Sequence, residues 1–420
     1  MKKTICISGL GYIGLPTAAM FATHGHKIIG VDTNTTVVSA LNQGKITIEE
    51  PYLDIMVQAA VTSGNLKAKT SPAEADVFII AVPTPIEKNK TADMSCVISA
   101  AEAIVPYLKK GNVVILESTS PPGTVEELLI PILEKSGLKI GEELYVAYSP
   151  ERVLPGKILT ELVENNRIIG GVNEKSCKVV RELYRTFVRG EIYLTTPTTA
   201  EMTKLMENTF RDVNIALANE LAKLSESMGI NAWDVIEFAN KHPRVNIHQP
   251  GPGVGGHCLA VDPWFIVEKQ PDLANIIKLS RNTNDSMPNH VVKRINEILK
   301  DIKGKKKVTI LGITYKPNID DMRESPILEM IDILEKDEDV EITVHDPFVH
   351  NCKYLEKDLY KSIRDSHLVV LGVNHDAFIK VDFSKIKDIM KERNILDTKD
   401  FWNEKEVEKE GLNYYLLGKK

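Results

Sequence analysis

The sequence predicts an α/β protein with two Rossmann-like doubly wound domains, joined by a long central helix and a small all-helical domain. Three observations lead to this prediction. A strand, a glycine-rich turn and a helix open the chain, a stretch without glycine or proline spans residues 198–228, and strands alternate with helices again from residue 308. A chain of 420 residues is long enough for two or three domains. We place the domain boundaries at 1–195, 196–302 and 303–420.

The overall composition excludes several classes of partner. Hydrophobic residues make up 43% and charged residues 26% of the chain, and the net charge of −6 includes no basic block, so we expect no nucleic-acid partner. No apolar run reaches the roughly 18 residues that a membrane span needs, so we expect a cytoplasmic protein without a membrane partner. The cysteine number, 5, is odd, and no pair has C-x-x-C spacing, so neither disulfides nor a metal site is expected.

The first element is the apolar strand Thr4–Ser8, followed by the pattern G-x-G-x-x-G and a helix that ends near His24. Asp32 closes the next strand, and this context favours a dinucleotide site over a glycine-rich turn with a surface acid. The turn would place a pyrophosphate at a helix N-terminus, while Asp32 would accept hydrogen bonds from ribose hydroxyls and repel a 2′-phosphate, so NAD is predicted. The expected cofactor contacts are Gly9, Gly11, Tyr12, Ile13, Gly14 and Asp32.

Further strands are predicted at 76–82, 112–117 and 144–148. Ligands of open parallel sheets bind beyond the carboxyl ends of the strands, where Thr84 and Thr119 follow two of them. Both threonines are candidates for the cofactor site, with helix capping as the alternative. The third strand runs into the loop Ser149–Gly156, which carries an acid and an arginine.

The stretch 198–228 carries an apolar stripe at helical spacing and would form a helix about 45 Å long. Gly229 would end it. A helix of this length typically joins domains or forms a subunit interface, so we expect a homodimer, with a homotetramer as the alternative. Lys204, Asn208 and Arg211 fall on one face of this helix, where a solvated face is the alternative to a functional one.

The segment Gly251–Asp262 is rich in glycine and contains Cys258. Glycine lets a ligand approach the backbone, and nearby N–H groups can stabilise an oxyanion, so Cys258 is a candidate nucleophile. A buried free cysteine beside a turn is the alternative. The third domain begins with a strand at 308–313 and continues through a polar loop at 315–326, a helix at 327–335, and strands at 341–345 and 367–373, without a glycine fingerprint.

Several motifs in a fixed order make the chain resemble the UDP-glucose/GDP-mannose dehydrogenase family, the nucleotide-sugar 6-dehydrogenases, over nearly its whole length. They are the glycine fingerprint, Ala-Val-Pro-Thr-Pro at 81–85, Glu-Ser-Thr at 117–119, Lys204 with Asn208, Gly-Val-Gly-Gly-His-Cys at 253–258 with Asp262, and the segment 315–326. The resemblance implies NAD-dependent four-electron oxidation of the sugar C6 alcohol of a UDP-sugar to a carboxylate. A thiohemiacetal and then a thioester would form on Cys258, and water would hydrolyse the thioester.

The resemblance also implies a role for each site residue. Cys258 is the nucleophile, Lys204 acts either as an acid/base or as a charge stabiliser, and Asn208 donates to the same oxygen. Asp262 tunes Lys204 and helps to position water, and Thr119 with Glu151 orders or activates the hydrolytic water. Arg323 is expected at the cofactor phosphates. The expected substrate contacts are Glu151, Arg152, Val153, Lys204, Asn208, Arg211, His242, Arg244, Gly255, Tyr315 and Lys316.

The chain departs from the UDP-glucose pattern in two loops. Pro155 replaces an acid and Val261 replaces a lysine, while Arg152 and His257 are added. These forms resemble the branch acting on UDP-N-acetylhexosamines, so the expected substrate is UDP-N-acetyl-D-mannosamine, with UDP-N-acetylglucosamine or UDP-glucose as alternatives. Two other hypotheses are a two-electron dehydrogenase with a structural Cys258 and a catalytically silent binding protein. The joint presence of the site residues argues against the silent protein.

Overall fold

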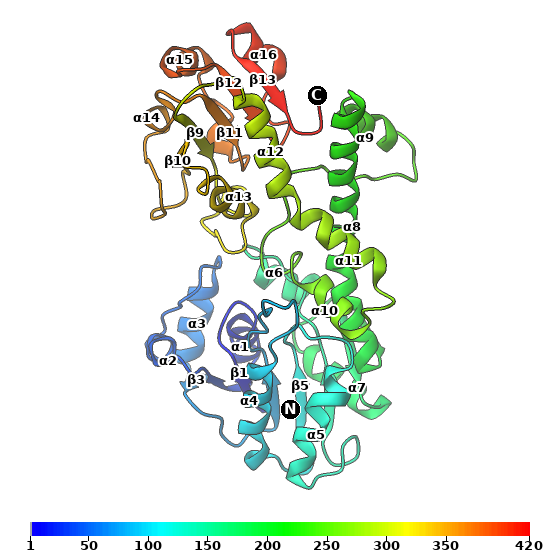
Figure 1. Ribbon diagram of the computed structural model, residues 1–420. Coiled ribbons are helices and arrows are strands. Elements are labelled where there is room, and N and C mark those ends of the chain that lie inside the picture. The colour runs from blue at the N-terminus through cyan, green and yellow to red at the C-terminus, as the bar shows by residue number, and fades with distance from the viewer. Residues whose placement is uncertain (1) are drawn as a thin grey trace. The chain divides into compact units, whose positions relative to one another are not determined.

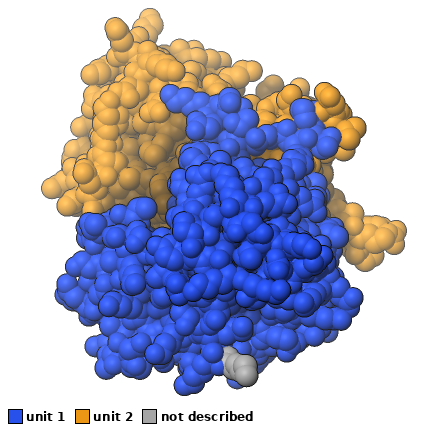
Figure 2. Space-filling model, turned by 90° about the horizontal axis from the view of Figure 1, so that it is seen from below, with its two compact units in different colours: residues 1–207, 268–271 blue, residues 208–267, 272–420 orange. Residues whose placement is uncertain are grey.

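The computed structural model describes residues 2–420, and its chain divides into two compact units. The first contains the residues up to 207 together with 268–271, and the second contains 208–267 and 272–420, as Figure 2 shows in two colours. The division falls inside helix α8 (Pro197–Met228). The three domain boundaries drawn from the sequence stay a prediction.

The first unit is built on an eight-stranded sheet with the order β3-β2-β1-β4-β5-β6-β7-β8 (Figure 1). All neighbouring strands are parallel except β6 and β7, which are antiparallel. The strands are β1 Thr4–Ser8, β2 Lys27–Val31, β3 Leu66–Lys69, β4 Val77–Ile80, β5 Val113–Leu116, β6 Tyr145–Tyr148, β7 Arg167–Gly171 and β8 Ile192–Thr195. The predicted α/β fold class is confirmed, and the reversal at β7 is a feature that the sequence analysis does not predict.

Helices cover both faces of this sheet. Residues of α1, α3, α6 and α7 share one core cluster with the sheet, and residues of α4, the π-helix and α5 share the other. The central strands have apolar residues on both faces, as a parallel sheet covered on both sides requires. The helices are α1 Gly14–Thr23, α2 Thr35–Asn42, α3 Leu53–Thr62, α4 Ser95–Ile104, the π-helix Val125–Leu129, α5 Ile130–Leu133, α6 Ile158–Glu164 and α7 Glu174–Tyr184.

The second unit contains a five-stranded parallel sheet with the order β10-β9-β11-β12-β13. Its strands are β9 Lys306–Leu311, β10 Val340–His345, β11 Leu368–Leu371, β12 Asn394–Asp397 and β13 Asn413–Leu416. Helices α12 and α13 pack on one face, and α14, α15 and α16 on the other. The helices of this unit are α9 Ala232–Asn240, α10 Asp262–Lys269 (shared with the first unit), α11 Asn275–Asp285, α12 Met287–Leu299, α13 Pro326–Leu334, α14 Leu359–Ile363, α15 Phe383–Ile389 and α16 Glu404–Lys409.

The long helix predicted at 198–228 is α8, and Gly229 follows it with a positive φ of 72°. Its predicted apolar stripe divides into two sets. Leu205 and Ala216 are buried, whereas Leu217 and Leu224 are exposed by 54% and 51%. Within residues 2–420, no helix combines the length and the apolar character needed to cross a membrane.

Candidate active site

The glycines of the first unit form a tight turn between β1 and α1. A Cβ on Gly9 would lie 2.4 Å from the Ala81 carbonyl oxygen, and a Cβ on Gly14 would lie 1.8 Å from the Gly9 carbonyl oxygen. Gly11 has no heavy atom within 4 Å of its Cβ position, so its surface is open to a ligand. No side chain caps the N-terminus of α1, and its first turn has no acid. These features suit a pyrophosphate bound by backbone N–H groups.

Asp32 lies at the end of β2, next to this turn. One of its carboxylate oxygens accepts a hydrogen bond from Leu10 N at 3.1 Å, and the other accepts from Asn34 N at 2.9 Å. The residue is half-buried, so these oxygens have lone pairs left for ribose hydroxyls. The turn and Asp32 together fit a dinucleotide. Tyr12 is exposed beside them, and Ile13 is the residue before α1.

Thr84 and Thr119 follow β4 and β5, and both are half-buried. Neither caps a helix, because the next helical segments begin at Ser95 and Val125. The capping alternative is therefore not supported, and both threonines remain candidates for ligand contact.

The loop after β6 is held by a buried ion cluster. Glu151 accepts a hydrogen bond from the Arg167 guanidinium, which also donates to Ser149 Oγ at 3.0 Å and lies 3.4 Å from Glu117 Oε1. The Tyr184 hydroxyl donates to the same oxygen of Glu117. Burial raises the pKa of Glu117 to about 7, although Arg167 acts in the opposite direction. Arg167 and Tyr184 have no local pattern that marks them as parts of this site, and Glu117 stands out in the sequence only as the first residue of the motif Glu-Ser-Thr at 117–119.

The same loop is fixed at its other end by Glu50, which accepts from Gly156 N at 2.7 Å and from Ile158 N at 2.8 Å. Arg152 donates to Glu207 and to the Asn166 carbonyl. Arg152, one of the residues expected to contact the sugar, thus forms an ion pair with Glu207 within the first unit.

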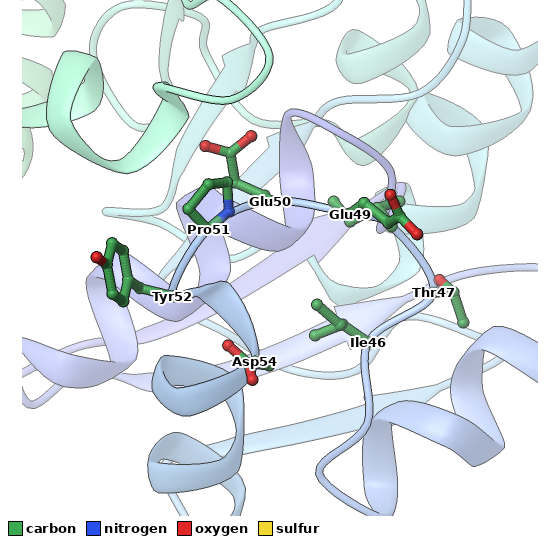
Figure 3. Close-up of a pocket in the computed structure, with 8 residues that line it drawn as sticks. Ile46, Thr47, Glu49, Glu50, Pro51, Tyr52 and Asp54 are labelled. Carbon is green, nitrogen blue, oxygen red and sulfur yellow. The ribbon is translucent and has the colours of Figure 1, made fainter. Parts of the chain in front are cut away.

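Val153 packs against the core of the first unit. Figure 3 shows Glu50 beside Pro51 and Tyr52 in an open hollow on that unit. The hollow is lined by Ile46, Thr47, Ile48, Glu49, Glu50, Pro51, Tyr52 and Asp54.

In the second unit, Cys258 is exposed at the end of the glycine-rich loop. Its carbonyl oxygen accepts from Asp262 N at 2.9 Å, so one turn connects the cysteine to the start of α10. Asn208 Nδ2 donates to Asp262 Oδ2 at 2.5 Å. Lys204 lies four residues before Asn208 on α8 and is nearly buried, with 7% exposed. The structure therefore brings Asn208 and Asp262 together, and it places Cys258 one turn before Asp262.

The glycines of this loop lie against the segment 315–326. A Cβ on Gly255 would lie 2.3 Å from the Glu324 carbonyl oxygen, and a Cβ on Gly256 would lie 2.8 Å from the Tyr315 ring. Gly256 also has a positive φ of 83°. Close packing therefore requires these glycines, and it places Tyr315 beside the cysteine loop, while the predicted contact of Tyr315 with the substrate stays a prediction.

Among the other predicted site residues of this unit, Arg323 forms an ion pair with Asp321. Arg323 donates to Asp321 through Nε at 2.9 Å and Nη2 at 2.7 Å. Burial lowers the pKa of His257, and Arg323 lowers it further, while Asp321 opposes this shift. The remaining predicted substrate contacts, Lys316, Arg211, His242 and Arg244, are exposed, and Arg244 Nη2 lies 3.4 Å from His242 Nε2.

In residues 2–420, no three His, Cys, Asp or Glu side chains are arranged to hold a metal ion.

Three consecutive segments match the models of one protein family. Residues 3–188 match the NAD binding domain of the UDP-glucose/GDP-mannose dehydrogenase family, residues 198–286 its central domain, and residues 309–404 its UDP binding domain.

The chain is also similar over its full length to individual proteins. It is 49% identical to the UDP-N-acetyl-D-mannosamine dehydrogenase of Methanocaldococcus jannaschii, covering 99% of this chain and 96% of that protein. It is 45% identical to the NDP-N-acetyl-D-galactosaminuronic acid dehydrogenase of Ralstonia nicotianae, covering 96% and 97%. The solved UDP-N-acetyl-mannosamine dehydrogenase of Staphylococcus aureus superposes with a TM-score of 0.90 at 48% identity, covering 99% and 98%.

Proposed function

The chain belongs to the UDP-glucose/GDP-mannose dehydrogenase family, and from that premise we propose that it oxidises the C6 alcohol of UDP-N-acetyl-D-mannosamine to the carboxylate. The enzyme uses NAD, as its family does. The observation that carries the proposal is an exposed Cys258 one turn before the hydrogen-bonded pair of Asn208 and Asp262. A thiol in this setting turns a two-electron alcohol oxidation into a four-electron one, because it can hold the aldehyde covalently.

The identity of the sugar rests on two supports. Relatives named UDP-N-acetyl-D-mannosamine dehydrogenase are 46% to 49% identical to this chain, and the loops with Arg152 and His257 depart from the UDP-glucose pattern. The relative named for N-acetylgalactosaminuronic acid shares 45%, a difference too small to separate hexosamine epimers by itself. The substrate must therefore be tested directly against UDP-N-acetylglucosamine and UDP-glucose.

The proposed reaction has three stages. In the first oxidation a hydride leaves C6 as a base takes the hydroxyl proton, and NAD would supply the hydride acceptor for both oxidations when bound. Cys258 Sγ attacks the aldehyde carbon to give a thiohemiacetal, whose oxidation yields a thioester. Water then attacks the thioester carbonyl, the carbon–sulfur bond breaks, and Cys258 leaves as a thiolate. Thr119 and Glu151 are proposed to order or activate that water.

Lys204, Asn208 and Asp262 are proposed to act on the sugar oxygen. Lys204 is a nearly buried cation on α8 and suits either proton transfer or stabilisation of an alkoxide. Asn208 already donates to Asp262 in the absence of substrate, so its second amide hydrogen is the one proposed for the sugar oxygen. Asp262 is the first residue of α10, where the helix dipole favours its negative charge.

The other proposed contacts are made either to the cofactor or to the UDP-sugar. Thr84, Tyr12, Ile13 and Arg323 are assigned to the cofactor together with the glycines and Asp32. The proposed contacts to the UDP-sugar are Glu151, Arg152, Val153, Arg211, His242, Arg244, Gly255, Tyr315 and Lys316.

We further propose a homodimer formed through α8, with a tetramer as the alternative. Phe210, Leu217 and Leu224 repeat every seven residues on α8 and are exposed by 60%, 54% and 51%. A long apolar face of this kind is typical of a helix that packs against a second copy. The product, an activated uronic acid, suits polysaccharide biosynthesis in the cytoplasm.

The test is the number of NADH molecules formed per UDP-N-acetyl-D-mannosamine consumed, for the wild type and for Cys258→Ala. We expect two NADH per sugar from the wild type and no completed turnover from the variant. Cys96→Ala, which removes another exposed thiol, is the matched control and should keep full activity.

Three other results would contradict parts of the proposal. One NADH per sugar, or an unaffected Cys258→Ala variant, would make the cysteine structural. Binding of NAD and sugar without turnover would indicate a silent binding protein. Turnover of UDP-N-acetylglucosamine or UDP-glucose alone would keep the mechanism and replace the sugar.

A further inference from the structure

Two carboxylates of the first unit share one guanidinium. Glu117 follows β5, Glu151 follows β6, and Arg167 begins β7, which runs antiparallel to β6. Because of this reversal, the start of β7 extends past the end of β6, and Arg167 reaches the side chain of Glu151. The local change in strand direction thus brings a buried cation to two acids that are far apart in the sequence.

The cluster is buried and has more acids than bases. The side chains of Arg167, Glu117 and Glu151 are exposed by 4%, 0% and 7%. The Arg167 guanidinium lies 4.1 Å from the centre of the Tyr184 ring, so the aromatic face covers it. With both acids ionised the cluster would carry a net negative charge without water around it, which is costly. One of the two carboxylates therefore keeps a proton more readily than an exposed acid does.

Glu117 is the better candidate for that proton. Among the described residues, its Oε2 is buried and has no hydrogen-bond partner, whereas its Oε1 accepts from Tyr184. Both oxygens of Glu151 accept hydrogen bonds, one from Arg167 and one from the Arg152 backbone N–H. Burial raises the pKa of Glu117 to about 7; Arg167 lowers it and Glu151 raises it.

We propose that Glu117 is a positioning residue for the hydrolytic step, because it competes with Glu151 for the Arg167 guanidinium and thereby sets how strongly Glu151 attracts a proton from water. When Glu117 is protonated, Arg167 pairs fully with Glu151 and makes it a weak base. When Glu117 ionises, the guanidinium is shared and Glu151 becomes a stronger base. This inference rests on the proposed function, in which Glu151 takes a proton as water adds to the thioester carbon and Cys258 departs.

The inference predicts a pH dependence of thioester hydrolysis that a purely structural cluster would not give. The rate should rise on the order of tenfold as the pH passes from about 6 to about 8, since Glu117 ionises in this range. Glu117→Gln should keep the fold of the cluster but abolish this rise. Tyr184→Phe should shift the rise to higher pH, because the lost hydroxyl hydrogen bond favours the ionised form of Glu117.

The experiment uses the full chain with NAD and UDP-N-acetyl-D-mannosamine, quenched during turnover, with the acyl group on Cys258 followed by intact mass. The matched control is Glu201→Gln. Glu201 is a second buried acid of the same unit, whose pKa is also raised to about 7, and it accepts from Gly123 N and Val125 N instead of contacting Arg167. The control should keep the wild-type pH profile of hydrolysis.

Infrared spectroscopy of the protein without ligands supplies an independent measurement. The bands of protonated, buried carboxyls at about pH 6 should include one contribution that Glu117→Gln removes and Glu201→Gln leaves in place, because both acids have a pKa raised to about 7. If that variant does not fold, the Tyr184→Phe profile decides the question. A wild-type profile in either folded variant, or no protonated carboxyl at Glu117, would overturn the inference alone. Failure of the wild type to form any acyl-enzyme would instead overturn the proposed function and the inference with it.

Discussion

The two sheets begin with the same backbone arrangement but use it differently. In the first, Gly9 N donates to the Val31 carbonyl at 2.8 Å, and Leu10 N donates to Asp32 at 3.1 Å. In the second, Gly312 N donates to the His345 carbonyl at 2.8 Å, and Ile313 N donates to Asp346 at 2.8 Å. Each sheet thus places an acid at the end of the neighbouring strand, bonded to the turn after its first strand.

The difference lies in what surrounds the acid. Asp32 is half-buried and keeps lone pairs for a ligand, whereas Asp346 is 4% exposed and accepts from His375 Nε2 at 3.1 Å and Phe348 N at 2.9 Å. His375 Nδ1 in turn accepts from Asn318 N at 2.9 Å, which ties the pair to the loop carrying Tyr315. An acid at this position is therefore a candidate ligand group only where the fold leaves its oxygens accessible.

The largest expected effect comes from removing the two acids in turn. Asp346→Ala would leave buried N–H groups and His375 without their acceptor, and should cost about 3–5 kcal/mol of unfolding free energy. Asp32→Ala should cost only about 1 kcal/mol, because water can replace the carboxylate, but it should weaken NAD binding. Denaturant unfolding and calorimetric NAD titration measure the two quantities. Equal losses of unfolding free energy in the two variants would contradict the difference in burial between the two acids.

A smaller loss of stability should distinguish Gly14 from Gly11 in the turn between β1 and α1. Gly14→Ala would force a Cβ against the Gly9 carbonyl oxygen at 1.8 Å and should destabilise the unit by about 2–3 kcal/mol. Gly11→Ala meets no protein atom within 4 Å and should leave stability unchanged while lowering NAD affinity. Thermal unfolding and NAD titration of the pair measure these outcomes. A stable Gly14→Ala variant, or normal NAD affinity in Gly11→Ala, would contradict the open-turn interpretation.

The smallest effect is the opposite pH dependence of two strand-end acids. Glu117 has a pKa raised from 4.5 to about 7, so the folded state binds its proton more tightly than the unfolded state. Its stabilising contribution is therefore full below about pH 4.5 and is lost as the pH rises through about 7. Urea midpoints across this range should fall less in Glu117→Gln than in the wild type.

Asp346 should behave in the reverse sense. Burial raises its pKa, but hydrogen bonds from His375 and Ile313 outweigh burial and hold the pKa below 3.8. The stabilising contribution of Asp346 is present when the pH is above the pKa of an unfolded aspartate. It is lost as the pH falls through the lower pKa that Asp346 has in the folded state. Acid unfolding that is unchanged in Asp346→Asn would contradict this assignment.

Much of the fold follows from local sequence signals. The glycine fingerprint and the helical period of α8 (Pro197–Met228) are such signals, because they rest on backbone sterics and apolar spacing. The antiparallel direction of β7 depends instead on its pairing with β6, and the local residue pattern of a strand does not specify the direction in which it pairs. Strands β12 and β13 are four residues each and fall in segments left unassigned, because short apolar runs carry little periodic signal.

The candidate site was only partly predictable from the sequence, because some of its contacts join residues that are distant along the chain. Cys258 and Asp262 are near neighbours in sequence, so their placement one turn apart follows from local structure. Arg152 forms a pair with Glu207, and Arg167 joins Glu117 to Glu151, through contacts between residues far apart along the chain. Charge composition indicates that a loop has changed, but it does not indicate which side chain the new charge will contact.

The packing of the cysteine loop limits how the site can evolve. Gly255 faces the backbone of Glu324, and Gly256 has a left-handed conformation against the Tyr315 ring, so a substitution elsewhere cannot relieve both restrictions. Variation is directed instead to His257, whose side chain is 46% exposed. In this chain a change of side chain beside the nucleophile is therefore sterically possible at His257, while Gly255 and Gly256 hold the backbone under it in place.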